Sequence, residues 1–148
     1  MMRIANPAAA LLLFAKALEL EPANGEAQAN MKSATMLKCN LDADNANKLF
    51  RAGKHDDALL CYQSIDASQS GDECAFQIAN NMGAIYMQKQ NVLRALECFD
   101  KALALRPLSV DTIHNKAMAL KGSNQLVEAL AAFDQCIAAQ PDFYSALW

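Results

Sequence analysis

The stretch Phe76 to Pro107, FQIANNMGAIYMQKQNVLRALECFDKALALRP, decides the fold of this chain. It contains two short amphipathic segments separated by Gln90-Asn91, where we expect a turn between two helices. The small residues Gly83 and Ala95 fall where two packed helices would approach each other most closely. The stretch therefore predicts a hairpin of two helices.

The same pattern recurs along the chain at a spacing of 34 residues. The matched positions are Gly83 with Ala117, Tyr86 with Leu120, Ala95 with Ala129, Phe99 with Phe133, and Pro107 with Pro141. Upstream, Ala58 and Tyr62 precede Ala95 and Phe99 by 37 residues, so three residues are inserted near 68–72. Ala10, Phe14, Ala17 and Pro22 repeat the second-helix pattern once more. Such a period indicates an array of stacked helix pairs, because one pair cannot bury its apolar face alone.

The composition is that of an ordered helical protein. The chain has 148 residues, of which 53% are hydrophobic and only 7% aromatic, and alanine and leucine are abundant. Its net charge of -3 argues against nucleic-acid binding, which needs a basic surface. No apolar run is long enough to span a membrane, and the short run at 7–15 lacks the preceding basic residues of a signal peptide.

The cysteines predict reduced thiols rather than a disulfide or metal framework. The five are Cys39, Cys61, Cys74, Cys98 and Cys136. They are odd in number, widely spaced and form no CxxC pair, so neither a zinc site nor a disulfide scaffold is expected. Reduced thiols are typical of a cytoplasmic protein, and some of these would serve as small core residues. We expect no cofactor and no metal.

Paired helices of period 34 that carry small-x2-aromatic, then Ala-x3-aromatic-x2-small, then proline resemble the tetratricopeptide repeat (TPR) family. The resemblance implies an all-α fold, a right-handed superhelix of antiparallel helix pairs. It departs from the family pattern at Ala79 and Ile113, where a tryptophan is usual, and at Ser70, where a proline is usual. The resemblance nevertheless extends over nearly the whole chain.

This resemblance divides the chain into six parts. We expect residues 1–22 to be the second helix of a partial repeat, 23–38 an extra or extended helix, 39–72, 76–109 and 110–143 three repeats, and 144–148 the start of another. A chain that begins and ends inside a repeat would be a segment of a longer array. Within the last two repeats, the helices are expected over 73–89, 92–105, 110–121 and 126–139.

The segment 24–52 allows two interpretations. It contains no proline, and its only glycine is Gly25 at the start, so one long helix is possible. Alternatively, Asn40 would close one helix and Asp42 would cap the next. We expect a break or bend at 39–42.

In TPR arrays, the first helices of successive repeats line a concave groove that binds peptides. The residues that the resemblance places there as candidate contacts are Asn47, Arg51, Gln77, Asn80, Asn81, His114, Asn115, Met118 and Lys121, together with Met87, Gln88 and Asp111. Asn81 and Asn115 lie 34 residues apart, at a position where the family often uses asparagine to hold a peptide main chain. A carboxamide suits that role because it both donates and accepts hydrogen bonds. The alternative is that these asparagines are solvated or satisfied by neighbouring helices.

Some relatives grip the acidic C-terminal tails of cytosolic chaperones with a carboxylate clamp. The two asparagines of that clamp match Asn47 and Asn81, but its three basic residues fall on Ala43, Asp111 and Asn115. A carboxylate needs charge-assisted donors, and Asp111 would repel it. The sequence therefore argues against a chaperone tail as the ligand.

Catalytic motifs are not evident. His55 and His114 accompany no nucleophile or carboxylate at a recognisable spacing, and there is no phosphate loop, HExxH or EF-hand motif. We therefore predict a protein-interaction scaffold or adaptor rather than an enzyme. One alternative is a substrate-selecting or targeting segment of a larger enzyme. Another is self-association through apolar end faces, with Leu13 and Phe14 at one end and Phe143, Leu147 and Trp148 at the other.

Overall fold

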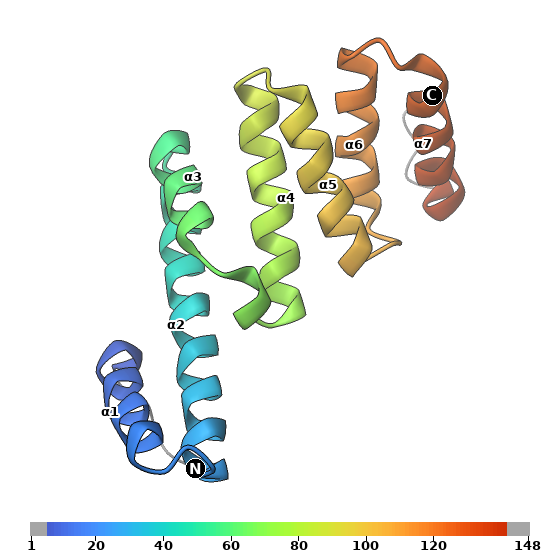
Figure 1. Cartoon of the computed structure of the whole chain (residues 1–148). Helices are drawn as coiled ribbons and strands as arrows, with labels where there is room; N and C mark the ends of the chain where they lie inside the picture. The colour runs from blue at the N-terminus through green and yellow to red at the C-terminus, as the bar shows by residue number, and fades with distance from the viewer. Residues whose placement is uncertain (1–5, 142–148) are drawn as a thin grey trace. The chain divides into compact units, whose positions relative to one another are not determined.

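The computed structural model describes residues 6–141 of the chain (Figure 1). Those residues form seven α-helices and one short 3-10 helix, with no strand among them, which confirms the predicted all-α helical-repeat fold. The chain divides into two compact units, residues 1–74 and 75–148. The predicted end-face residues Phe143, Leu147 and Trp148 lie outside the described residues.

The first unit begins with α1 (Pro7–Leu20), whose ends are set by local sequence. The side chain of Asn6 accepts a hydrogen bond from the backbone N–H of Ala9 at 3.2 Å, and Pro7 takes the first helical position. Glu21 ends the helix because the following Pro22 disfavours helical geometry at the residue before it. Helix α1 packs against α2.

Helix α2 (Gly25–Arg51) is continuous, so the break expected at 39–42 is wrong. The residues chosen as caps have other roles: the side-chain oxygen of Asn40 is buried without a hydrogen-bond partner within residues 6–141. Asp42 forms an ion pair with Lys38 one turn earlier, with 2.7 Å between Oδ2 of Asp42 and Nζ of Lys38. This pair supports the helix through residues 39–42. The buried Cys39 and Ala43 also lie within the helix and give it a packed face there.

Helix α3 (His55–Ser64) follows α2 after a tight turn and packs against it. The segment after α3, where the sequence has three inserted residues near 68–72, contains the 3-10 helix η1 (Ala67–Gln69), which also contacts α2. Asp66 caps η1 by accepting a hydrogen bond from the backbone N–H of Ser68 at 3.0 Å. The unit ends in the first turn of α4.

The second unit contains most of α4 (Asp72–Gln88), then α5 (Val92–Leu105), α6 (Val110–Gly122) and α7 (Leu126–Ala139). Figure 1 shows these helices side by side, each connected to the next by a short turn. Their bounds agree with the predicted ranges to within one residue. Helix α6 packs against both α5 and α7.

The turns inside the helix pairs share one backbone conformation. Gly53, Gln90 and Asn124 all have positive φ angles, of 78°, 58° and 64°. In each turn, the residue that follows donates its backbone N–H to a carbonyl five residues earlier, as Asn91 does to Tyr86 at 2.8 Å. Because these residues are spaced by the repeat offsets of 37 and 34, the backbone follows the period read from the sequence.

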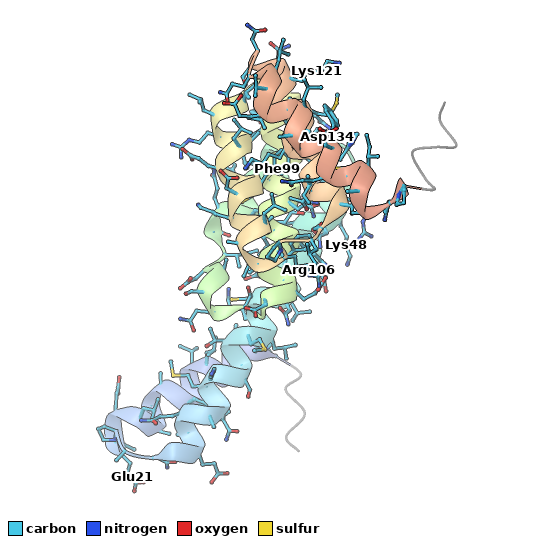
Figure 2. All side chains as sticks on the ribbon, turned by 90° about the vertical axis from the view of Figure 1, so that its right-hand side faces the viewer. Glu21, Lys48, Phe99, Arg106, Lys121 and Asp134 are labelled. Atoms are coloured by element: carbon cyan, nitrogen blue, oxygen red, sulfur yellow. The ribbon has the colours of Figure 1, made fainter. Side chains whose placement is uncertain are left out.

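The core of the second unit confirms the predicted roles of Gly83 and Phe99. The Phe99 side chain is 1% exposed and lies between α4, α5 and α6, in a cluster with Ala95 and Ala119 (Figure 2). A Cβ atom built on Gly83 would lie 2.5 Å from Cε1 of Phe99, so only glycine fits against this ring. A second cluster, built on Ile113, joins α6 to α7.

Candidate peptide-binding surface

Helices α4 and α6 are the first helices of the pairs in the second unit, and together they carry most of the candidate contacts. We call their candidate residues the first-helix surface. They are Gln77, Asn80, Asn81, Met87, Gln88, Asp111, His114, Asn115, Met118 and Lys121.

A buried hydrogen-bond chain joins the two helices. The hydroxyl of Thr112, which is fully buried, donates to Oδ1 of Asn80 at 3.1 Å. Since its single hydrogen is used in that way, the Ser109 hydroxyl 2.9 Å away donates to Thr112. Asn80 was predicted as a peptide contact, but its side-chain oxygen holds the start of α6 against α4.

Asn81 and Asn115 occupy equivalent positions on α4 and α6, and both are half-buried. The carboxamide of Asn115 makes no hydrogen bond to any other residue of the range 6–141. Its donors and acceptor are therefore available to a ligand. Because α4 is tied to α6 through Asn80, the spacing between these two asparagines is fixed by the packing of the helices.

From His114 onward, α6 carries an imidazole, an apolar and a charged side chain among the candidate residues. The ring of His114 is half-buried and packs edge-on against Phe133 of α7, with ring centroids 5.6 Å apart. Its Nδ1 atom is buried and has no hydrogen-bond partner among the residues that the structure describes. Met118 is 44% exposed, and Lys121 is exposed near the end of α6 (Figure 2).

The two remaining candidates, Asn47 and Arg51, belong to the first unit. Asn47 is buried, and its side-chain oxygen accepts a hydrogen bond from the hydroxyl of Tyr62 on α3. This contact ties α2 to α3, so the side chain has a structural partner. Arg51 is exposed at the last turn of α2.

The histidine, acidic and cysteine side chains of the described range form neither a metal cluster nor a disulfide. Within residues 6–141, no three His, Cys, Asp or Glu side chains gather in a way that would hold a metal ion. All five cysteines lie in that range, and no disulfide joins any two of them. Burial raises the pKa of the thiols of Cys39, Cys74 and Cys98, which keeps them protonated and unreactive near neutral pH.

Sequence reasoning missed two contacts that shape the surface. Thr112 was not singled out: Ser109 begins α6 as its N-cap residue, but Thr112 is not the Glu or Gln of a capping box, so no sequence pattern pointed to its contact with Asn80. The guanidinium of Arg106 lies 4.6 Å from the centre of the Phe76 ring, a cation–π contact between α5 and α4. No spacing rule links those two residues, so this contact became apparent only in the folded chain.

Comparison with known families is consistent with this arrangement. Residues 76–109 and residues 110–143 each match a family model described as the tetratricopeptide repeat. The chain contains a TPR segment. These two TPRs correspond to α4–α5 and α6–α7 with the conserved offset of 34 that the sequence shows. Residues 6–141 contain no helix with the length and apolarity needed to cross a bilayer.

One curated relative shares clear sequence similarity. Over 60 residues the chain is 33% identical to the mitochondrial import receptor subunit TOM70 of Homo sapiens. The match spans 40% of this chain and 10% of the receptor, so it corresponds to a small part of that protein.

Solved structures show the same fold at lower identity. The first TPR domain of Spaghetti (RPAP3), bound to the HSP90 peptide SRMEEVD, has a TM-score of 0.62 at 20% identity and covers 72% of this chain and 82% of its own. YrrB, described as a TPR protein with an unusual peptide-binding site, has a TM-score of 0.59 at 20% identity and covers 95% of this chain and 81% of its own. At these identities the likeness concerns the fold.

Proposed function

We propose that this chain is a protein-interaction module that holds an extended peptide on the first-helix surface. Asn81 and Asn115 bind the peptide main chain in this proposal. The observation that carries it is the repeated carboxamide: two asparagines at equivalent positions of two packed TPRs, one of them without any intramolecular hydrogen bond in residues 6–141. An extended peptide has donors and acceptors at regular intervals, which such a pair would match.

Neighbouring residues have supporting roles. Asn80 keeps α4 and α6 in register through Thr112, and Asn47 does the same for α2 and α3 through Tyr62. Gln77 and Lys121 offer exposed polar contacts. Met118 and the His114 ring provide apolar contact area beside Asn115. A peptide that alternates polar and apolar side chains suits this surface best.

An acidic chaperone tail is not the ligand that we propose. The RPAP3 domain was solved with an HSP90 peptide, but the basic positions of a carboxylate clamp are occupied here by Ala43, Asp111 and Asn115. Ala43 is buried and Asp111 is exposed. An acidic tail would therefore meet a carboxylate where it needs a cation.

We further propose a reducing, cytoplasmic location for the module. The support is that no disulfide joins any of its five cysteines, all of which lie within residues 6–141, and that burial raises the pKa of three of them. Such thiols fill space as small apolar side chains.

The test is to select binding peptides from a random display library and to map their position by NMR. Titration of the labelled full chain with a selected peptide should shift the amide and side-chain signals of α4 and α6, including the carboxamide of Asn115. The signal of Gln140, which is exposed just after α7, serves as the internal control. Shifts confined to α5 and α7 would contradict the proposal.

A second candidate, self-association, is supported by exposed apolar side chains on the outer helices. On α1, Leu12, Leu13 and Leu20 are 72%, 68% and 84% exposed, and on α7, Val127 and Leu130 are 78% and 64% exposed. Phe14, the other predicted end-face residue of α1, is half-buried. Light scattering over a concentration series should reveal dimers if these faces pair, and a constant monomer mass at high concentration would exclude this function.

A further inference from the structure

A separate pocket of about 440 Å³ lies between α5, α6 and α7, on the side of the second unit where the second helices are found. Its lining residues are Leu96, Asp100, Leu103, Ile113, Lys116, Leu120, Gln125, Glu128, Ala131, Ala132 and Gln135. None of them belongs to the first-helix surface. Pockets that bind ligands usually have volumes of about 300 to 1,000 Å³, so this one has room for a side chain of a partner.

The floor of the pocket is apolar and formed by core residues. Ile113 and Ala132 belong to the core cluster that joins α6 to α7, and Leu103 of α5 packs against the same cluster. The space exists because α7 has alanine at both 131 and 132. The equivalent residues on α5 are the larger Glu97 and Cys98.

The rim of the pocket carries an unbalanced negative charge. Nζ of Lys116 lies 2.6 Å from Oδ1 of Asp100, so these two charges neutralise each other. Glu128 is exposed and makes no ion pair with any residue of the range 6–141. Gln125 and Gln135 lie on the same face of α7 as Glu128 and add carboxamide oxygens that accept hydrogen bonds.

We propose that this pocket is a second docking site, which takes a partner segment with an aliphatic side chain next to an arginine. The aliphatic side chain enters between Leu103, Ile113 and Ala132, and the guanidinium pairs with Glu128. Arginine fits better than lysine because its planar guanidinium donates two parallel hydrogen bonds to one carboxylate and retains less hydration. The site acts independently of Asn81 and Asn115, so the module can hold two segments at once.

The experiment uses the full chain and short acetylated, amidated peptides. One contains a single Leu-Arg pair in a background of glycine, serine and alanine, and its matched partner contains Leu-Glu instead. Affinity is measured by NMR titration, with the shifted signals giving the position. We expect the Leu-Arg peptide to bind about threefold more tightly and to shift signals of the pocket residues, since an ion pair with the exposed Glu128 is screened by water and contributes about that factor.

Two variants separate the charge from the cavity. Glu128→Lys should abolish the preference for arginine, whereas the matched control Asp134→Lys should not, because Asp134 lies on α7 (Figure 2) but outside the pocket. Ala131→Phe fills the space from an exposed position and should block both peptides while leaving the far-UV circular dichroism unchanged.

The outcomes distinguish this site from the first-helix surface. Leu-Arg binding that survives in the Asn81→Ala, Asn115→Ala double variant supports the second site even if the first-helix surface binds nothing. The inference is overturned if the two peptides bind equally well, if Glu128→Lys and Asp134→Lys have the same effect, or if the shifted signals belong to α4.

Discussion

The two TPRs of the second unit follow the same sequence pattern but are packed differently. Phe99 of the first is 1% exposed, because α6 covers it with Ala119. Its equivalent Phe133 is only half-buried and has the edge of the His114 ring as a neighbour. The motif therefore predicts which residues face inward, while the burial of each depends on the side chains that pack around it.

The small-residue position shows the same difference. In the first TPR the Phe99 ring lies directly on Gly83, where no Cβ atom fits. In the second, Ala117 is tolerated and is fully buried in the cluster with Ile113. Glycine is thus required at position 83 because the Phe99 ring occupies the place of a Cβ atom, whereas the equally enclosed Tyr62 accompanies an alanine, Ala46, at the equivalent position.

Truncating the two phenylalanines should give the largest difference in stability between the two TPRs. Phe99→Ala should cost about 3 to 5 kcal/mol of the free energy of unfolding, as for other fully buried aromatic side chains. Phe133→Ala should cost only about 1 to 2 kcal/mol, because part of its ring is already in water. Urea unfolding followed by circular dichroism measures both, and equal losses would contradict the difference in packing.

Exchanging the small residues should have the next largest effect. Gly83→Ala should lower stability by about 1 to 2 kcal/mol, because overpacking against Phe99 outweighs the better helix propensity of alanine. Ala117→Gly should cost about 1 to 2 kcal/mol, from the lower helix propensity of glycine and the loss of a buried methyl group. Adding Phe99→Leu should relieve part of the Gly83→Ala loss, whereas strictly additive losses would show that the ring is not the cause.

The turns inside the helix pairs should differ by a smaller amount in the stability that their positive φ angles cost. Gln90 has a positive φ angle that costs an ordinary residue about 1 to 2 kcal/mol, whereas the equivalent Asn124 tolerates it and Gly53 adopts it freely. After allowance for the greater freedom of glycine when unfolded, Gln90→Gly should raise stability by about 0.5 to 1 kcal/mol. Asn124→Gly should change the stability by less. Thermal unfolding of the two variants measures both changes, and a larger change for Asn124→Gly than for Gln90→Gly would contradict the prediction.

The smallest effect concerns pH. Burial raises the pKa of Cys98, whose equivalent in the second TPR is Ala132. Above about pH 8.5 the unfolded chain ionises this thiol first, so its contribution to stability is lost as the pH rises toward the folded pKa. Cys98→Ala should therefore lose less stability than the natural chain between neutral and alkaline pH. The measurement is urea unfolding of both proteins at a series of pH values. The same decrease in the free energy of unfolding with pH for the natural chain and for Cys98→Ala would contradict this prediction.

Most of the second unit could be predicted from the sequence because its contacts recur with the period. The turn at Gln90, the enclosed Phe99 and the helix bounds all follow from residues 34 apart and are confirmed. The segment around Asn40 could not be predicted, because its asparagine and aspartate fit either a cap or a helix interior. Packing of the buried face of α2 and the pairing of Asp42 with Lys38 decide for the helix.

The site was predictable only in its outline. The period places Asn81 and Asn115 in equivalent positions, but the structural partners of other candidates are remote in sequence. Asn80 bonds to a threonine 32 residues away, and Asn47 to a tyrosine 15 residues away. A single sequence gives no rule for such pairs, so peptide contacts and structural contacts looked alike.

The central claim is that Asn81 and Asn115 together hold a peptide main chain. Calorimetric titration of a display-selected peptide into the Asn81→Ala, Asn115→Ala double variant tests it most directly, with Gln140→Ala as the control that removes an exposed amide elsewhere. We predict that the double variant keeps its helical circular dichroism and loses binding by about a hundredfold, since two hydrogen bonds of about 1 to 1.5 kcal/mol each are removed. Unchanged affinity in the folded double variant would contradict the account.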